Sequence, residues 1–491
     1  MLALALALAA TAAGPVARTD DGPVQGQALT GGGAVFRGIP YAAPPVGARR
    51  WRAPQRPRGW TTPRAAIAPH AACPQIVFGD WNRSAAADSA EDCLFVDVRT
   101  PTMTPSAKLP VLVWIHGGSN RAGAGSGTVE SRITDRGLVL VSVQYRLGTL
   151  GFLSHPALSR EQGGRSGNYG LMDQQAALRW VRRNIARFGG DPARVTIAGE
   201  SAGAMDVGLH LLSPGSRGLF HQAIAESGTA GFGTAPRSLR DNETLGIAIA
   251  RAAGLPTAAT AAQLRRLSVD AILRADGGID VAGLGDDSFV WLQAIVDGRV
   301  LPDTPARLLA SGRINYVPLV IGVNARELPL YGGLSGAAAT VRREFGAHAD
   351  RALRLYGLQP DGTPVSDPRL GDVTMQLATD ITFRCPMVAV SNALTAHGGT
   401  VWQYQFDYAP PGGTVSHASE LGYLFDAPEP GEPPLQAYWA NFVTTGDPNG
   451  GRLVRWPSYD RTGRAYLALG QDGPVARTGL RRAICDLRDA P

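Results

Sequence analysis

Hydrophobic residues gather in short runs along the chain, and these runs alternate with segments of helical periodicity. The runs are rich in β-branched residues, as buried strands are. They cover residues 111–115, 138–143, 195–198, 317–321 and 401–406. Between the second and third runs, one helical face is marked by Leu171, Leu178, Val181, Ile185 and Phe188. This alternation predicts an α/β fold, with a large, mostly parallel sheet covered by helices on both faces and its chemistry beyond the carboxyl ends of the strands.

The pattern gives no sign of a domain boundary after the first residues. There is no internal repeat, and the Pro/Gly-rich stretches 410–413 and 428–434 are too short to be linkers. We therefore expect residues 14–491 to form a single domain. Residues 1–13 are almost wholly Ala and Leu; they are too short to span a bilayer but have the length of the apolar core of an export signal. They predict a signal remnant and a secreted or periplasmic protein without stable membrane insertion.

Composition and charge narrow the class of protein. With 491 residues, of which 44% are hydrophobic and 18% charged, the chain can bury a large core. The net charge of +6 could suggest a nucleic-acid partner, but Lys108 is the only lysine and the arginines are scattered. We expect surface arginines and no nucleic acid. The four cysteines contain no C-x-x-C pair, which favours two disulfides and leaves three pairings open.

One short motif carries the first chemical signal. Gly199-Glu-Ser-Ala-Gly203 follows the strand 195–198 and precedes a helical stretch, residues 202–212. The G-x-S-x-G pattern in a strand-turn-helix context is typical of a nucleophile elbow, where a sharp turn leaves no room for flanking side chains. Ser201 is therefore the predicted nucleophile, and the N–H of Ala202 is expected to point at the same space.

A second glycine motif follows the strand 111–115. In His116-Gly-Gly-Ser119, the glycines allow the backbone to approach a substrate closely, and hydrolases use N–H groups of such a loop to bind the oxyanion of the tetrahedral intermediate.

A serine hydroxyl also needs a base and an acid. Of the eight histidines, His417 lies beyond the strand 401–406, on a loop that could reach Ser201. In the chain order Ser, acid, His, Glu327 follows the strand 317–321 and a predicted turn at residues 322–324.

These residues lie in longer segments that resemble the type-B carboxylesterase/cholinesterase family of α/β-hydrolases. The resemblance runs over nearly the whole chain. The segments that carry it are FRGIPYAAPPVG (36–47), EDCL (91–94), NYGLMDQ (168–174), FGGDPARVTIAGESAG (188–203), GVNARE (322–327), HASEL (417–421) and WANFVTTGDPN (439–449).

The resemblance implies an α/β-hydrolase fold whose long excursions form a substrate gorge. It assigns Ser201 as nucleophile, His417 as general base and Glu327 as the acid. The remaining implied roles are oxyanion donors at Gly118, Ser119 and Ala202, disulfides Cys73–Cys93 and Cys385–Cys485, and a structural ion pair between Arg50 and Glu91.

Several positions depart from the family pattern. Ser119 stands where a third glycine is usual and brings a Cβ to the approach of the acyl or alcohol group, which disfavours bulky esters. Leu328 and Ala418 replace glycines next to the acid and the histidine. Trp81 could offer one aromatic face to a choline group. Leu330 replaces the second aromatic residue, so we expect a general carboxylesterase.

The sequence thus predicts a serine hydrolase that cleaves small carboxylic esters through an acyl-enzyme, without metal or cofactor, as a monomer or weak homo-oligomer. Three alternatives remain open at this point: a non-catalytic adhesion or binding member of the fold, an interfacial lipase, and an amidase.

Overall fold

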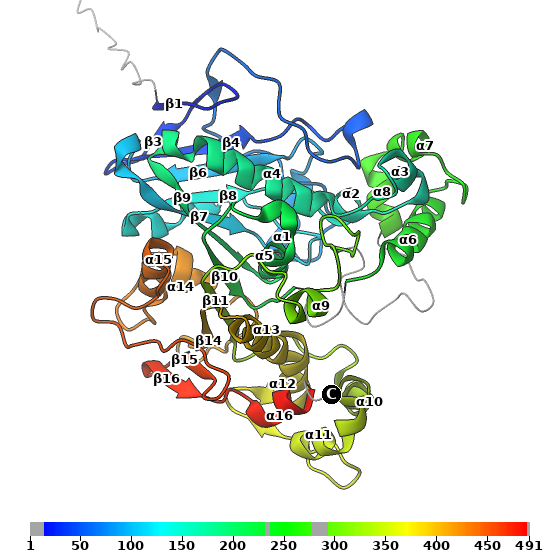
Figure 1. Ribbon diagram of the computed structural model, residues 1–491, viewed down its shortest axis with the longest axis vertical. Coiled ribbons are helices and arrows are strands. Elements are labelled where there is room, and N and C mark those ends of the chain that lie inside the picture. The colour runs from blue at the N-terminus through cyan, green and yellow to red at the C-terminus, as the bar shows by residue number, and fades with distance from the viewer. Residues whose placement is uncertain (1–13, 231–235, 277–292, 489–491) are drawn as a thin grey trace, which may run out of the picture.

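The computed structural model describes residues 14–230, 236–276 and 293–488. The predicted signal remnant, residues 1–13, lies outside these ranges. The central element is an eleven-stranded sheet in the order β16-β15-β14-β11-β10-β9-β7-β8-β6-β4-β3 (Figure 1). Its strands are β3 (Gln27–Ala28), β4 (Ala34–Pro40), β6 (Phe95–Thr100), β7 (Leu109–Ile115), β8 (Val139–Val143), β9 (Gly190–Glu200), β10 (Gln222–Glu226), β11 (Leu319–Asn324), β14 (Val401–Asp407), β15 (Ala465–Gly470) and β16 (Gly473–Thr478).

The sheet is parallel from β15 through β8 and antiparallel only towards its two edges. All five predicted strands lie in the parallel part, which confirms the predicted α/β class. The carboxyl ends of β9, β10, β11 and β14 therefore meet at one edge, where the loops after them can converge.

Helices cover both faces of the sheet, and alternate residues of β7 show why. Val111, Val113 and Ile115 pack into one core with α4 (Tyr169–Asn184), α5 (Ala202–Leu212) and α13 (Cys385–Ala396). Leu112 and Trp114 pack into the other core, with α14 (Leu421–Phe425) and α15 (Leu435–Thr445). A strand buried on both faces must be hydrophobic at every position, as this run is.

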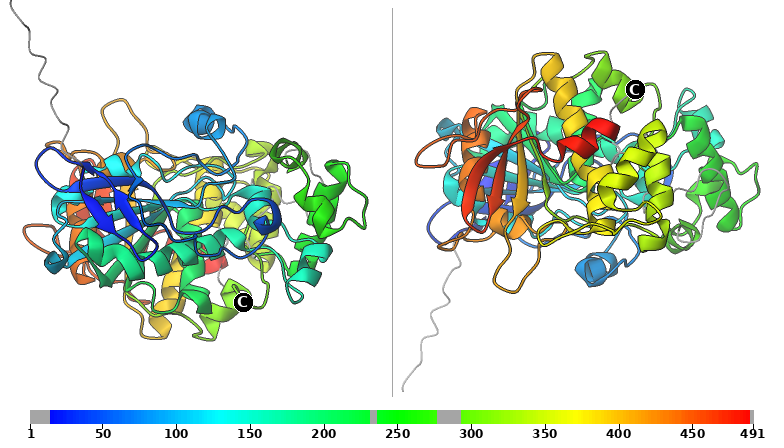
Figure 2. Two further views of the ribbon diagram at one scale, coloured as in Figure 1. Left: turned by 90° about the horizontal axis from the view of Figure 1, so that it is seen from above. Right: turned by 90° about the horizontal axis from the view of Figure 1, so that it is seen from below.

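The remaining helices form excursions from the sheet. In Figure 1 one group, α3 and α6–α8, lies at the right, and another, α10–α12 with α16, at the bottom. In the left view of Figure 2, α6–α8 (green) lie opposite the first strands (blue). The helices that together form the excursions are α1 (Asp80–Ala87), α2 (Gly148–Phe152), α3 (Pro156–Glu161), α6 (Leu239–Ala252), α7 (Ala261–Arg265), α8 (Val269–Asp276), α9 (Pro305–Ala310), α10 (Gly333–Phe345), α11 (Ala349–Tyr356), α12 (Val373–Thr379) and α16 (Arg482–Arg488).

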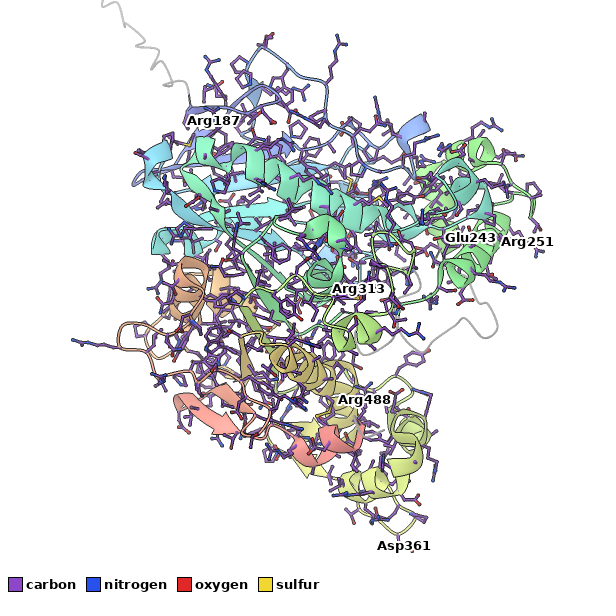
Figure 3. The ribbon with its side chains drawn as sticks, in the orientation of Figure 1. Arg187, Glu243, Arg251, Arg313, Asp361 and Arg488 are labelled. Carbon is purple, nitrogen blue, oxygen red and sulfur yellow. A yellow bond between two sulfur atoms is a disulfide. The ribbon has the colours of Figure 1, made fainter. Side chains whose placement is uncertain are left out.

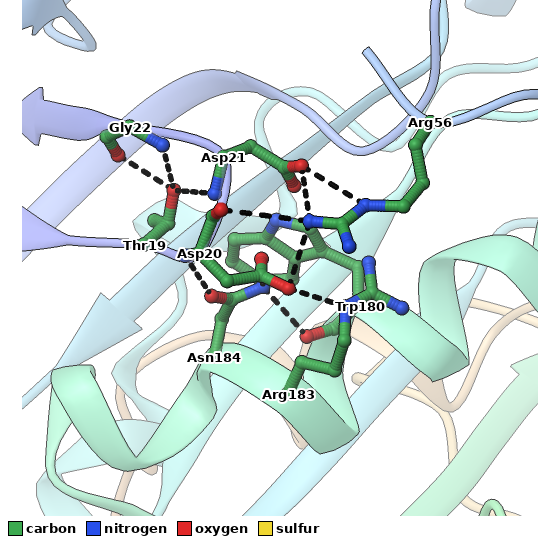
Figure 4. A network of polar contacts seen from close by, with 8 residues as sticks. All are labelled: Thr19, Asp20, Asp21, Gly22, Arg56, Trp180, Arg183 and Asn184. Carbon is green, nitrogen blue, oxygen red and sulfur yellow. Dashed lines mark hydrogen bonds and ion pairs between the residues drawn. The ribbon is translucent and has the colours of Figure 1, made fainter. Parts of the chain in front are cut away.

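The small sheet of β1 (Val16–Arg18), β2 (Pro23–Gln25) and β5 (Arg64–Ala65) joins the main body through polar contacts with α4. Asp20 and Asn184 exchange hydrogen bonds, each 2.8 Å long, and Arg56 binds both Asp20 and Asp21 (Figure 4). This network attaches the first strands to the C-terminal end of α4.

Two disulfides fix the excursions. Cys73–Cys93 closes the loop that contains α1, and Cys385–Cys485 joins the start of α13 to α16. These are the two pairings implied by the family resemblance. Arg50 and Glu91 also meet as expected: the guanidinium donates to both carboxylate oxygens, at 2.6 and 2.5 Å.

The arginines are dispersed, as the sequence predicts. Arg187, Arg251 and Arg313 lie on three different parts of the surface in Figure 3. In the ranges that the structure describes, no helix has the length and apolar character needed to cross a membrane.

Candidate active site

Ser201 lies at a sharp turn between β9 and α5, as predicted for a nucleophile elbow. Its backbone is in a region that L-residues rarely adopt, with φ +58° and ψ −123°, a conformation that costs on the order of 1–3 kcal/mol. The Ser201 N–H donates to the carbonyl oxygen of Glu226 at 2.8 Å, and the Ser201 carbonyl accepts from the Met205 N–H at 3.0 Å. The neighbouring strand and the helix thus hold the strained residue in place.

The two glycines of the elbow are required by space. A Cβ on Gly199 would lie 2.7 Å from the carbonyl oxygen of Ile115, and one on Gly203 only 2.0 Å from the same atom. The predicted reason for the motif, a turn with no room for flanking side chains, therefore holds in atomic detail.

Ser201, His417 and Glu327 come together in one line of hydrogen bonds. His417 Nε2 lies 2.8 Å from Ser201 Oγ, and His417 Nδ1 lies 2.6 Å from Glu327 Oε2. Glu327 is 1% exposed. Its other oxygen, Oε1, accepts the Ser227 O–H and the Asn324 N–H, both at 2.7 Å. The carboxylate is therefore fixed at both oxygens, and one of them faces the imidazole.

The strand before Glu327 is longer than the sequence predicts. Residues 322–324 are not a turn but the last residues of β11, paired with β14 from Tyr404 to Phe406. Gly322 suggests a turn, yet it serves packing here: a Cβ at this position would lie 2.0 Å from the Tyr404 ring. The turn comes after Asn324 and still delivers Glu327 to His417.

The loop after β7 packs directly against the elbow. A Cβ on Gly117 would lie 3.0 Å from Ser201 Cβ. Gly118 and Ser119 follow with φ of +97° and +58°, and both line the cavity into which Ser201 opens. Ala202 is the first residue of α5, so its N–H has no partner within the helix. Gly118 and Ser119 thus line the cavity beside Ser201, and Ala202 directly follows Ser201 at the start of α5.

A buried cluster of carboxyl groups that was not among the predicted site residues surrounds this site. Glu200 Oε1 lies 3.2 Å from His417 Nε2. Glu226 accepts the Trp439 N–H at 2.9 Å, and Glu420 accepts the Asn324 side-chain amide at 2.7 Å. Glu200 stands inside the serine motif and Glu420 three residues after His417. Their positions were visible, but only the fold shows that they converge.

Burial and mutual repulsion set the charges of this cluster. Burial raises the pKa of Glu200 to about 8, although His417 opposes the shift. Burial, together with the charge of Glu420, also raises the pKa of Glu226 well above its usual value. For His417, burial would lower the pKa, but the charges of Glu200 and Glu327 and the hydrogen bond to Glu327 outweigh it and raise the pKa above 6.5.

Ser201 and His417 open into a cavity of about 1190 Å³, the expected gorge. Its wall includes Leu328, Ala418 and, from the disulfide-closed loop, Trp81. Trp81 is 64% exposed. Leu330 packs against the main core and is not part of this wall. Among the described residues, no group of three or more His, Cys, Asp or Glu side chains is placed to hold a metal ion.

Comparisons with known proteins show the family to which this chain belongs. The family described as "Carboxylesterase family" matches residues 13–487. Carboxylesterase 1D of Rattus norvegicus is 32% identical, over 94% of this chain and 91% of its own. Para-nitrobenzyl esterase of Bacillus subtilis (strain 168) is 33% identical, over 88% and 90%. The solved structure of a thermophilic PNB esterase superposes with a TM-score of 0.82 at 29% identity, covering 96% of this chain and 99% of its own.

The fold is therefore that of an α/β-hydrolase. The chain belongs to the carboxylesterase family and is a carboxylic ester hydrolase.

Proposed function

We propose that this esterase works through a Ser201–His417–Glu327 triad and an acyl-enzyme intermediate. The observation that carries the proposal is the unbroken line of hydrogen bonds from Ser201 Oγ through the imidazole to Glu327, at the wall of a large cavity. The alternative of a non-catalytic binding protein is less favoured, because Ser201, His417 and Glu327 all lie within hydrogen-bonding distance of one another along this line.

The first half of the reaction forms the acyl-enzyme. Ser201 Oγ attacks the ester carbonyl carbon while His417 Nε2 takes the hydroxyl proton, and Glu327 stabilises the imidazolium that results. The carbonyl oxygen, now negative, accepts from the N–H groups of Gly118, Ser119 and Ala202. The C–O bond to the alcohol then breaks, and His417 returns the proton to the leaving oxygen.

The second half repeats the sequence with water. His417 removes a proton from water as its oxygen attacks the acyl carbon, the same N–H groups bind the oxyanion, and the bond to Ser201 Oγ breaks. The carboxylic acid leaves, and Ser201 regains its proton. Every step uses groups of this chain and water, so we expect no cofactor requirement.

Purified protein assayed with p-nitrophenyl esters tests the proposed function. We expect saturable hydrolysis of short linear acyl esters with a burst of p-nitrophenol close to one equivalent per enzyme when deacylation is slow. Activation only above the concentration at which an ester aggregates would instead identify an interfacial lipase, and faster cleavage of the matched anilides an amidase.

Ser119→Gly is expected to widen the range of esters. Ser119 has a φ of +58° and lies on the cavity wall. Glycine adopts this conformation without strain, which favours the folded state by about 1 kcal/mol, and the lost side chain makes room beside Ser201. Hydrolysis of tert-butyl acetate should rise about 10-fold, a gain of roughly 1.4 kcal/mol, with p-nitrophenyl acetate changed less than about threefold. Equal changes for both esters would contradict the role given to Ser119.

The pH dependence of kcat/KM should reveal the effect of the surrounding carboxylates on the pKa of His417. The base must be neutral, so kcat/KM falls as the pH drops through the pKa of His417. An unperturbed histidine would place this limb near pH 6.5, but Glu200 and Glu327 raise the pKa and move the limb to higher pH.

Glu200→Gln removes one of these charges and should shift the acidic limb of kcat/KM down by on the order of one pH unit. The pH profiles of wild type and variant, measured side by side with one ester, decide this. An acidic limb that stays in place, or moves up, would show that Glu200 does not set the protonation of His417.

We further propose that residues 14–491 act as one catalytic domain and that the protein is exported. Two disulfides support export, because such bonds persist in oxidising compartments.

A further inference from the structure

A buried hydrogen bond joins the two elements that carry the candidate oxyanion donors. Gly118 and Ser119 lie on the loop after β7, whereas Ala202 begins α5. Asn120 follows Ser119 on the loop, and Asp206 lies on the second turn of α5. Asn120 Nδ2 donates to Asp206 Oδ1 at 3.0 Å, and both residues have no exposed surface. This contact bears directly on how the donors are placed relative to one another.

Asn120 in turn fixes the conformation of its loop. Its φ is +55°, and its carbonyl oxygen accepts the Gly148 N–H at 2.7 Å. The Tyr145 hydroxyl lies 3.1 Å from Asn120 Oδ1 and 2.7 Å from the carbonyl oxygen of His116. Tyr145 therefore contacts the loop on both sides of the Gly117–Ser119 segment, and the Asn120 side chain links these contacts to Asp206.

The partners of Asp206 make both of its oxygens acceptors. Gln174 Nε2 donates to Asp206 Oδ2 at 2.6 Å, while Gln174 Oε1 lies 2.8 Å from His210 Nε2. Burial lowers the pKa of His210 to about 3, so the ring is neutral and has one N–H. His210 Nδ1 lies 2.8 Å from Ser216 Oγ, and with the ring N–H on Nε2, facing Gln174 Oε1, the Ser216 hydroxyl donates to Nδ1. In this arrangement the NH₂ group of Gln174 faces Asp206.

We propose that Asp206 is a positioning residue for the esterase reaction: through Asn120 it holds the Gly118 and Ser119 N–H groups in register with the Ala202 N–H. The inference rests on the proposed function, since it assigns these three groups to the oxyanion. Asp206 lies behind the loop and touches neither substrate nor reacting atoms. Displacement of donors by a fraction of an ångström weakens transition-state binding more than substrate binding.

An exchange of the two side chains provides the test. Asp206→Asn places an NH₂ group against that of Asn120 or of Gln174, and Asn120→Asp sets two carboxyl groups face to face. In the double variant the hydrogen bonds are complementary again. The introduced amide donates through its NH₂ group to the introduced carboxylate, which also accepts from Tyr145, and the oxygen of that amide accepts from Gln174.

We expect each single variant to lose about 10- to 100-fold in kcat, with KM changed less than about threefold, because the lost geometry matters in the transition state. The double variant should recover to within about fivefold of wild type. Burial raises the pKa of Asp206 to about 7, so assays are run at about pH 8.5, where its carboxylate is charged. Affinity for a trifluoromethyl ketone, whose oxyanion mimics the intermediate, should follow kcat across the series.

Asp20→Asn is the matched control. It makes the same substitution at another Asp–Asn pair, with Asn184 Nδ2 donating to Asp20 Oδ1 at 2.8 Å, in a network at the C-terminal end of α4 that contains none of the proposed catalytic residues (Figure 4). Its kcat should stay within about twofold of wild type. If the single variants fail to fold, Tyr145→Phe removes one hydroxyl at nearly constant volume and should lower kcat and ketone affinity together.

The proposal is overturned if both single variants keep wild-type kcat and ketone affinity, or if the double variant is as impaired as the worse single variant despite a wild-type melting temperature. For Tyr145→Phe, unchanged kcat and ketone affinity would also contradict it. Failure of the proposed function is distinguishable, because the wild type itself would then not hydrolyse esters through Ser201.

Discussion

Replacing Ser201 by alanine should lower kcat for p-nitrophenyl acetate by about 10⁴-fold or more, because the attacking oxygen is lost while binding and oxyanion stabilisation remain. Ser201 Oγ lies 2.8 Å from His417 Nε2, and the substitution removes only this oxygen. The substitution does not change the steric demands on the backbone turn, because serine and alanine both have a Cβ. The purified variant is assayed at enzyme concentrations high enough to measure the residual rate.

The folded state of this variant serves as its own control. Ser201 is buried, with 8% of its surface exposed. Its backbone N–H and carbonyl form hydrogen bonds with β10 and α5, and these bonds do not involve its side chain. The melting temperature should therefore stay within a few degrees of wild type, as for a change below about 1 kcal/mol. A folded Ser201→Ala protein with more than a few per cent of wild-type kcat would remove Ser201 from the reaction.

Glu327→Gln should lower kcat by about 10³- to 10⁴-fold, because it forces the wrong imidazole tautomer. Two donors, the Ser227 O–H and the Asn324 N–H, bind Oε1 at 2.7 Å. The amide oxygen of glutamine must take that place, which turns its NH₂ group towards His417 Nδ1. The imidazole then accepts at Nδ1, and its proton moves to Nε2, the atom that must take the proton of Ser201.

Glu226→Gln is the matched control for that change. Glu226 belongs to the same buried carboxyl cluster, and burial raises its pKa well above the usual value, which favours its neutral form. A neutral amide of the same shape can still accept the Trp439 N–H. We expect kcat within about fivefold of wild type. Equal losses in the two variants would mean that Glu327 acts only through packing and general charge, not through the tautomer of His417.

Most of the architecture could be predicted because the parallel strands are hydrophobic at every position. Residues 111–115 read as a strand buried on both faces, and they are. The elbow was also predictable from its two glycines, which are required because a Cβ on Gly199 or Gly203 would lie 2.7 or 2.0 Å from the carbonyl oxygen of Ile115. The carbonyl oxygen belongs to a distant strand, but the motif itself is a local signal because its glycines flank the serine between a strand and a helix.

Other features depend on contacts between distant segments and left no local signal. Gly322 indicated a turn, but its lack of a side chain admits the Tyr404 ring from the next strand. The gathering of Glu200, Glu226 and Glu420 depends on three strand ends and loops that only the sheet order brings together. For the same reason, the raised pKa of His417 could not be predicted from its own neighbours in the chain.

The central claim is that Ser201, activated by His417, forms the covalent intermediate. Labelling with a fluorophosphonate tests it most directly: Ser201 Oγ displaces fluoride at phosphorus, and the adduct is mapped by mass spectrometry of peptides. We predict one label per chain, on Ser201, with labelling slowed at least about 10³-fold in His417→Ala, which lacks the base. A label on another residue, or no label on a protein that still hydrolyses esters, would contradict the account.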